Sequence, residues 1–342
     1  MKANFGKRIH RLRRLACLWI VGVAIAQAVA AQPLEWHRFT QGKAQTGIFE
    51  PSAVRQLADG RLFVVQDEAS AAFSTLTLSD QGLAQEFSPN TDALGKALPR
   101  LNDLEGLALG PNGALYAITS FSHMKSGKRP ATRQIFAQVH ITAGEITRLT
   151  VYDNLLGDII AAYPALKSAK KSPFAKGRRG FNIEGLGFDR SGKNLLIGLR
   201  GPVLGKDSLI LRLENPSGVF KGQPPRFSPD MIRLDLNKAG IRALSYIPAL
   251  GVYLLVAQKA NKKGASNLAS HLWVWSGDPN STPTRLDIPG LDLRNAEGIT
   301  QIRHMDRDYI FLVSDDGDRA KARPAHYTML PVSLVATYLP NP

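Results

Sequence analysis

One stretch of the sequence decides the fold: Phe181-Asn-Ile-Glu-Gly-Leu-Gly-Phe-Asp-Arg-Ser-Gly-Lys-Asn-Leu-Leu-Ile-Gly-Leu-Arg200. Its apolar runs, residues 183–188 and 195–199, are of strand length, and the residues between them are typical of a tight turn. The stretch is therefore predicted to form a β-hairpin. Because a hairpin doubles back, Glu184 and Arg200 are expected at the same end of it, where a carboxylate and a guanidinium come within reach of each other.

The same phrase recurs along the chain. Asp103-Leu-Glu-Gly-Leu-Ala108 and Asn295-Ala-Glu-Gly-Ile-Thr300 repeat the Glu-Gly pair and lead into a second apolar strand, and two degenerate copies begin near Ser52 and Ile241. The anchors at residues 52, 105, 184, 242 and 297 are spaced by about 55 residues with one longer interval, a period typical of propeller blades rather than helical repeats.

Each repeat supplies about four strands, the size of one blade. We therefore predict an all-β protein, a β-propeller of four-stranded antiparallel blades, with five blades visible in the sequence and room for a sixth. Residues 34–39 are expected to pair with strands near the chain end, since the ring of a propeller must close. The outer strand pairs are predicted at residues 135–141 with 146–152, 208–213 with 231–236, and 271–275 with 284–288.

The first 31 residues read as a signal peptide. Basic residues up to Arg14 precede an apolar segment, residues 15–26, and Ala28-Val-Ala30 offers small side chains for cleavage. We expect a periplasmic or secreted protein with residues 32–342 as one propeller domain; a retained membrane anchor is the alternative. The single cysteine, Cys17, lies in the predicted signal, so the mature chain is expected to hold together by core burial without disulfides or a membrane span.

The longer interval between the second and third repeats holds a basic insertion at about residues 155–180. Its first part, residues 155–166, is apolar enough for a short helix. A basic run such as the one that follows is most often a solvated loop, but its place before the central hairpin favours a positive rim around one end of the ring. The run comprises Lys167, Lys170, Lys171, Lys176, Arg178 and Arg179, and other loops at that end carry Lys125, Lys128, Arg129, Arg133, Lys259, Lys262, Lys263, Arg319, Lys321 and Arg323.

The hairpins place a mixed set of charged side chains at this same end. Oxygen and guanidinium groups there suit an anionic small molecule or an envelope polyanion beneath the basic rim. The alternative is structural, with Glu184 paired to Arg200 and the other carboxylates bound to backbone groups of neighbouring blades. The candidate ligand-binding residues are Glu105, Glu184, Arg200, Arg242 and Glu297; Asp67, Ser120, Gln258 and Asp315 are expected at the same end.

Carboxylates near the last repeat suggest a cation site. Asp315 and Asp316 end the strand that pairs with the one holding Glu297, and hard cations prefer such oxygen ligands. We therefore predict Ca²⁺ or Mg²⁺ at Glu297, Asp315 and Asp316. A cation there could bridge a bound anion to the acidic residues.

Several phrases resemble a bacterial family of exported propellers whose function is uncharacterised. They are Asn182-Ile-Glu-Gly-Leu186, Leu199-Arg-Gly-Pro202, Gly240-Ile-Arg242, Asn295-Ala-Glu-Gly-Ile299 and Ser314-Asp-Asp-Gly317. The Glu-Gly phrases and the last turn are more distantly similar to phytase-like or esterase-like propellers. That resemblance implies hydrolysis of phosphate esters or metal-assisted anion binding, although the dense acidic ligand sets of calcium-dependent propeller phytases are not evident.

Other chemistry is not indicated by the sequence. It lacks G-x-S-x-G, a phosphate-binding G-x-x-x-x-G-K-[S/T] loop and H-E-x-x-H, and its seven histidines are scattered. Nucleic acid is disfavoured because the basic residues are not interleaved with aromatic side chains. Two hypotheses follow for an expected monomer: a non-catalytic propeller that binds an anion or an envelope partner, or a divalent-cation-dependent phosphoesterase or esterase.

Overall fold

The computed structural model describes residues 34–39, 47–67, 72–87, 101–143, 145–172, 180–259 and 270–340. The signal peptide predicted at residues 1–31 lies outside these residues, as do Lys176, Arg178 and Arg179 of the insertion, and Lys262 and Lys263. The described strands belong to one compact unit, Pro33–Pro342. Within the described residues, no helix has the length and apolarity needed to cross a membrane.

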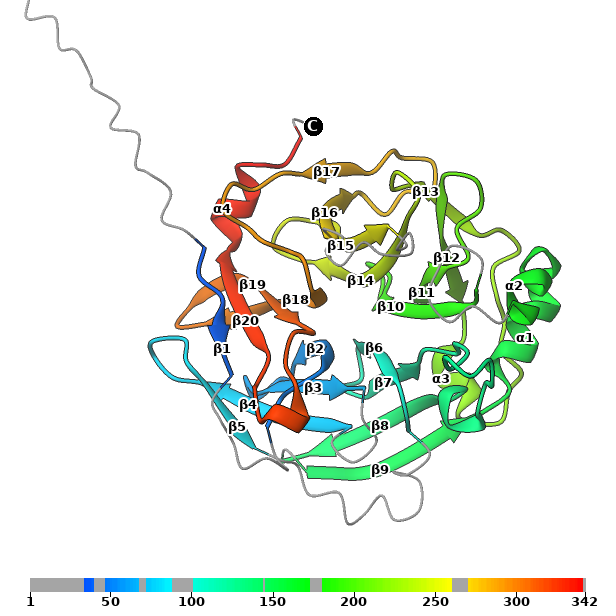
Figure 1. The fold of residues 1–342 in the computed structure, drawn as a ribbon, viewed down its shortest axis with the longest axis horizontal. Helices are drawn as coiled ribbons and strands as arrows, with labels where there is room; N and C mark the ends of the chain where they lie inside the picture. Colours follow the sequence, from blue (N-terminus) through cyan, green and yellow to red (C-terminus); the bar gives the residue numbers. More distant parts are fainter. Residues whose placement is uncertain are drawn as a thin grey trace, which may run out of the picture. The chain divides into compact units, whose positions relative to one another are not determined.

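Five sheets of four antiparallel strands surround a common centre (Figure 1). The predicted all-β propeller is confirmed, and the described part of the chain has five blades rather than six. The sheets are, in order, β2 (Pro51–Gln56), β3 (Leu62–Gln66), β4 (Phe73–Leu78) and β5 (Ala84–Phe87); β6 (Leu104–Leu109), β7 (Leu115–Thr119), β8 (Phe136–Thr142) and β9 (Glu145–Tyr152); β10 (Asn182–Phe188), β11 (Leu195–Gly201), β12 (Asp207–Leu213) and β13 (Ile232–Asp235); β14 (Ala239–Ile247), β15 (Val252–Lys259), β16 (Ser270–Trp275) and β17 (Thr284–Leu286); and β18 (Ala296–His304), β19 (Arg307–Ser314), β20 (His326–Pro331) and β1 (His37–Arg38).

The fifth blade is made from both ends of the chain, as predicted for residues 34–39. Strand β1 pairs antiparallel with β20, with His37 opposite Tyr327. The Phe39 N–H donates to the Ala325 carbonyl at 2.9 Å, and the Phe39 and Tyr327 rings lie 4.8 Å apart. This pairing closes the ring.

Apolar side chains fill the spaces between neighbouring sheets. One core cluster joins Leu196 and Ile210 of the third sheet to Leu255, Trp273 and Trp275 of the fourth. The sequence of a strand buried on both faces in this way is a nearly continuous apolar run, because each face packs against a neighbouring blade. The packing brings β2, β6, β10, β14 and β18 together around the central channel.

The insertion forms a short helical segment, as predicted. It contains α1 (Leu155–Ala162), the 3₁₀ turn η4 (Pro164–Leu166) and α2 (Lys167–Lys171). Leu155 and Ile159 of α1 are buried in a cluster with Phe181 of the central hairpin. The α2 helix lies at the outer edge of the ring in Figure 1, and Lys170 and Lys171 are exposed there. The basic rim predicted partly from these two lysines stays a prediction.

Two further short helices and two short 3₁₀ turns complete the described elements. The helices are α3 (Pro216–Val219) and α4 (Val332–Ala336), and the turns are η3 (Ala131–Arg133) and η5 (Arg319–Lys321). Val219 of α3 is buried in the same cluster as α1, and Val335 of α4 is buried beside the fifth sheet.

Candidate functional site

All five inner strands carry a β-bulge at the same place. The pairing of β10 with β11 passes from Ile183 to Gly185 and leaves Glu184 without a partner in the ladder. A bulge of this kind redirects the extra side chain and increases the local twist. The extra residues of the five strands are Ser52, Glu105, Glu184, Arg242 and Glu297. The repeated phrase of the sequence thus marks one ring of side chains at one mouth of the central channel.

The glycine that follows each bulged glutamate is required by packing between blades. A Cβ on Gly298 would lie 2.5 Å from Val313 Cγ2 and 3.1 Å from the Ala53 Cα of the next inner strand. A Cβ on Gly185 would lie 2.9 Å from the Ile241 side chain. The Glu-Gly phrase therefore pairs a side chain of the mouth with a position where two inner strands approach too closely for larger residues.

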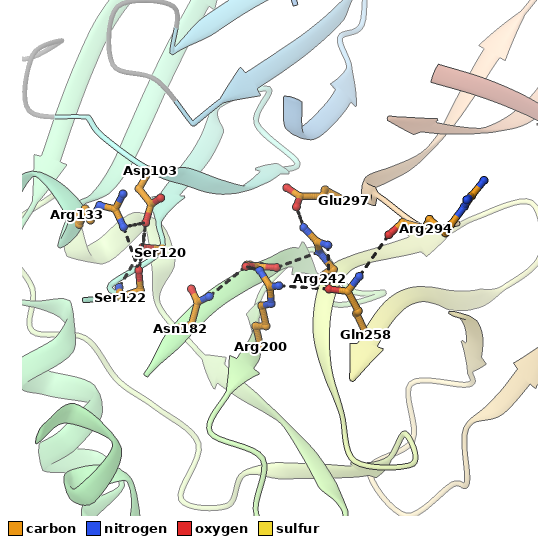
Figure 2. A network of polar contacts seen from close by, with 11 residues as sticks. Asp103, Ser120, Ser122, Arg133, Asn182, Arg200, Arg242, Gln258, Arg294 and Glu297 are labelled. Atoms are coloured by element: carbon orange, nitrogen blue, oxygen red, sulfur yellow. Dashed lines mark hydrogen bonds and ion pairs between the residues drawn. The ribbon is translucent and has the colours of Figure 1, made fainter. Parts of the chain in front are cut away.

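An ion-pair network joins the third, fourth and fifth blades across the mouth (Figure 2). The Arg200 guanidinium donates to Glu184, which confirms the pairing predicted from the hairpin. Arg242 lies between two carboxylates: its Nε is 3.4 Å from Glu184 Oε2, and its terminal nitrogen pairs with Glu297. Both guanidinium groups also donate to Gln258, at 3.3 Å and 3.1 Å.

Glu105 has a different environment from the other two glutamates. It is half-buried, and no described residue forms a hydrogen bond or an ion pair with its side chain. Burial, together with the negative charges of Glu184, Asp103 and Asp67, raises its pKa well above the ordinary value for a glutamate. Glu105 therefore keeps its proton to higher pH than an isolated glutamate and can donate a hydrogen bond from it.

A second polar group lies beside Glu105, in the loops of the second blade. Asp103 accepts hydrogen bonds from Ser120 and Ser122 and forms an ion pair with Arg133 at 2.9 Å. Burial and the nearby Asp103 raise the pKa of Asp67 to about 7. Arg133 was expected to lie on the basic rim; the structure pairs it with the acidic residues of the mouth (Figure 2).

The three residues predicted to hold a cation differ in their surroundings. Glu297 pairs with Arg242, whereas Asp316 accepts a hydrogen bond from Ser314 and lies 2.6 Å from the Nδ1 atom of His326. Asp315 is exposed, and its charge acts on Arg200 and Arg242. Among the described residues, no group of three or more His, Cys, Asp or Glu side chains is placed to hold a metal ion. The Ca²⁺ or Mg²⁺ site stays a prediction.

Sequence reasoning missed Arg55, which lies within the channel and lines cavities on both sides of it. Its guanidinium donates to the carbonyls of Val54, Leu186, Leu244 and Ile299, which come from four different inner strands. The degenerate first repeat lacks the Glu-Gly pair, so no recognised motif pointed to this arginine. The signal that could have revealed it is its position, three residues after the bulge, where the other repeats have a small residue: Ala108, Gly187, Ser245 and Thr300.

The fold and the polar mouth define the chain as a five-bladed β-propeller with charged bulge residues around one end of its channel. A family model described as a protein of unknown function (DUF3616) matches residues 131–223, which lie mainly in the second and third blades. No curated protein matches this sequence.

The chain is similar in fold to solved propeller enzymes. An exo-β-1,3-galactanase from Phanerochaete chrysosporium is 10% identical with a TM-score of 0.50, over 89% of this chain and 65% of that one. An exo-β-1,3-galactanase from Clostridium thermocellum is 11% identical with a TM-score of 0.49, over 87% of this chain and 62% of that one. The chain thus spans less than two thirds of the length of each. At these identities the likeness shows the fold alone.

Proposed function

We propose that the protein is an exported, ligand-binding propeller that takes an anionic group, from a small molecule or an envelope polyanion, at the mouth formed by Glu105, Glu184, Arg200, Arg242 and Glu297. The observation that carries this proposal is the partly exposed Arg200 guanidinium at the mouth, together with Glu105, whose pKa is raised by burial and by nearby carboxylates. A protonated carboxyl donates a hydrogen bond, and the Arg200 side chain keeps 18% of its surface exposed. Both can contact the same carboxylate, phosphate or sulfate oxygen atoms.

Charge around the mouth supports an anionic ligand. Strand β15 ends at this end of the ring with Lys259, and the loops that follow β7 and β19 leave from the same end. Their exposed basic side chains raise the local concentration of anions. They are Lys125, Lys128, Lys259, Lys321 and Arg323.

The ion pairs of two glutamates and the raised pKa of the third favour binding over hydrolysis. Glu184 and Glu297 each form an ion pair with a guanidinium, which occupies carboxylate oxygen atoms that would otherwise be free to bind water. Burial and nearby carboxylates raise the pKa of Glu105, so it keeps its proton to higher pH than an ordinary glutamate and can act as a base only after losing it. The arrangement therefore suits recognition of a charged group better than activation of water.

The pH dependence of anion binding tests this proposal. Dextran sulfate is a suitable probe because its sulfate groups do not titrate, and neutral dextran is the matched control. When pH rises through the raised pKa of Glu105, the mouth gains a negative charge and loses a donor. We expect affinity, measured by calorimetry at constant ionic strength, to fall by about tenfold or more between a pH below that pKa and a pH above it, equivalent to about 1.4 kcal/mol.

Two variants separate Glu105 from other titrating groups. Glu105→Gln keeps a hydrogen-bond donor and cannot ionise, so its affinity should change much less with pH. Arg200→Gln removes a positive charge from the mouth and should weaken binding at both pH values. Equal pH dependence in the wild type and Glu105→Gln, or unchanged affinity in Arg200→Gln, would contradict the proposal.

A divalent-cation-dependent phosphoesterase is the second candidate, favoured by one observation. Burial and neighbouring carboxylates raise the pKa values of both Asp67 and Glu105, and a cation would favour the ionised form of such crowded carboxylates. The expected ligands are Glu297, Asp315 and Asp316, with Glu105 and Glu184 as further carboxylates. A cation on Glu297 has to compete with the Arg242 guanidinium for the same carboxylate.

Thermal unfolding in EDTA and in a calcium titration checks this second candidate. A cation that binds only the native state would stabilise it by about 2.7 kcal/mol at 100 times its dissociation constant. We expect a calcium-dependent rise in Tm that Glu297→Gln removes, and such a result would justify a screen of phosphate esters. Identical Tm values with EDTA and calcium in the wild type would rule out this site.

A further inference from the structure

The residue three positions after each bulge forms a second ring, deeper in the channel. The five residues are Arg55, Ala108, Gly187, Ser245 and Thr300. Arg55 has a long cationic side chain, whereas the other four residues are small. Because the other four side chains are small, the Arg55 guanidinium has room at the centre of the channel. It donates hydrogen bonds to the carbonyls of Leu186, Leu244 and Ile299 on other blades.

Arg55 separates two cavities. One is a small cavity on the side of the acidic mouth, lined by Ser52, Glu184 and Glu297 as well as Arg55. The other is a cavity of about 480 Å³ that also has Arg55 in its lining, together with residues from the far ends of the inner strands. The channel is therefore divided by a charged side chain, and the larger cavity belongs to the opposite mouth of the ring.

The base of this second cavity is polar and buried. Arg55 is 8% exposed, and Ser245 and Thr300 are each 5% exposed. The two hydroxyls reach only the carbonyl of the next residue, at 3.4 Å and 3.3 Å, which are long hydrogen bonds. Both hydroxyls can therefore donate to a ligand at little cost.

The charge at this base is positive. No carboxylate of the described residues forms an ion pair with Arg55, and its four hydrogen-bond acceptors are neutral carbonyls. Burial lowers the pKa of Arg55 to about 10, so it stays charged at neutral pH. A buried cation that forms no ion pair is costly, and the negative charge of an anion in the adjoining cavity would offset that cost.

The walls of the cavity define the rest of the ligand. Phe188 and Tyr246 supply aromatic surface, and Leu109 and Ile302 add aliphatic surface. The acidic residues in the lining have other partners: Asp189 accepts hydrogen bonds within its own turn, from Ser191 and Asn194, and Asp308 lies 4.0 Å from Arg303, which also lines the cavity.

We propose that the second mouth binds a small organic monoanion, with its carboxylate directed to Arg55, Ser245 and Thr300 and its apolar body against Phe188 and Tyr246. The volume of about 480 Å³ lies in the usual range for small-molecule sites, which are mostly apolar with a few placed polar groups. This site is separate from the mouth of the proposed function.

Benzoate is the probe for this site, and benzamide is its uncharged control of similar shape. Binding to the full mature chain is measured by calorimetry. We expect the wild type to bind benzoate at least tenfold more tightly than benzamide. Arg55→Met should reduce benzoate affinity by tenfold or more, whereas Arg233→Gln, which removes an exposed cation outside the cavity, should leave the affinity unchanged.

A second variant keeps the test decisive if Arg55→Met does not fold. The double variant Ser245→Val/Thr300→Val retains Arg55 and removes both hydroxyls from the base, so benzoate affinity should fall by a similar factor. Equal affinity for benzoate and benzamide would overturn the proposal. It would also be overturned if Arg200→Gln abolished benzoate binding while the double variant had no effect, because the probe would then occupy the first mouth.

Discussion

At the scale of single residues, the three glutamates of the first mouth differ in their interaction partners. Arg242 is buried between Glu184 and Glu297, and burial and the charge of Arg200 lower its pKa. Glu105 lacks such a partner among the described residues, and its pKa is raised. Glutamates in equivalent repeat positions thus differ in their partners, because the fourth repeat supplies Arg242 where the second, third and fifth repeats supply a glutamate.

Glu105→Gln is expected to make the protein more stable at alkaline pH. A carboxyl whose folded pKa lies above its unfolded value binds more protons in the folded state, so stability is lost as pH rises from the unfolded value towards the folded value. The variant removes this loss. Urea unfolding should give equal free energies near pH 4 and a higher value for Glu105→Gln at pH 8.

Glu184→Gln is the matched control, and it is expected to lower the free energy of unfolding at pH 8, where Glu105→Gln raises it. It removes the carboxylate that both Arg200 and Arg242 use, and loss of one partner of a buried ion pair costs about 3–5 kcal/mol. If both variants changed stability in the same direction at pH 8, the assignment of a raised pKa to Glu105 and of an ion-pairing role to Glu184 would be wrong.

At the scale of elements, each inner strand combines a bulge with close packing against its neighbour. The bulge brings one side chain to the mouth, and the next residue is Gly106, Gly185 or Gly298 in three blades and Ala53 or Ala243 in the others. A β-bulge and a small residue are needed together, because the redirected strand approaches the next blade closely.

Gly298→Ala is expected to destabilise the fold by about 1–3 kcal/mol, the usual cost of overpacking. The added methyl would meet Val313 Cγ2 and the backbone of Ala53. The midpoint of urea unfolding measures the effect. The double variant Gly298→Ala/Val313→Ala should recover part of the loss relative to the sum of the single variants; strict additivity would show that this contact is not the cause.

At the scale of the whole molecule, closure of the ring depends on a short segment at residues 34–39. Strand β1 completes the fifth sheet, and the Thr328 hydroxyl donates to the Glu35 carbonyl at 2.7 Å. Phe39 is fully buried among residues of the first and fifth sheets, including Val64, Phe311 and Tyr327. The segment therefore links the first blade to the last.

Phe39→Ala should cost about 3–5 kcal/mol, because it removes a large side chain from a packed core. Urea unfolding followed by circular dichroism measures the change. Glu35→Ala is the control from the same segment; its side chain is exposed, and only its backbone carbonyl is used in the contact with Thr328. A loss below about 1 kcal/mol in Phe39→Ala would mean that closure does not depend on this packing.

Local features of the sequence were enough to predict the blades and one ion pair. The repeat spacing predicted the inner strands, and the hairpin alone placed Glu184 next to Arg200, which the structure confirms. The roles of the candidate residues as ligands for an anion or a cation stay predictions. The likeness to phytase-like propellers also stays a prediction.

The sequence by itself determined a propeller of four-stranded blades with a Glu-Gly phrase in three of them, because strand length, turn residues and repeat spacing are local properties. Only the tertiary structure decided that Arg242 joins Glu184 to Glu297 and that Arg55 divides the channel. These side chains belong to different blades. Their contacts depend on the bulges and on closure of the ring, which bring residues more than 50 positions apart to one axis.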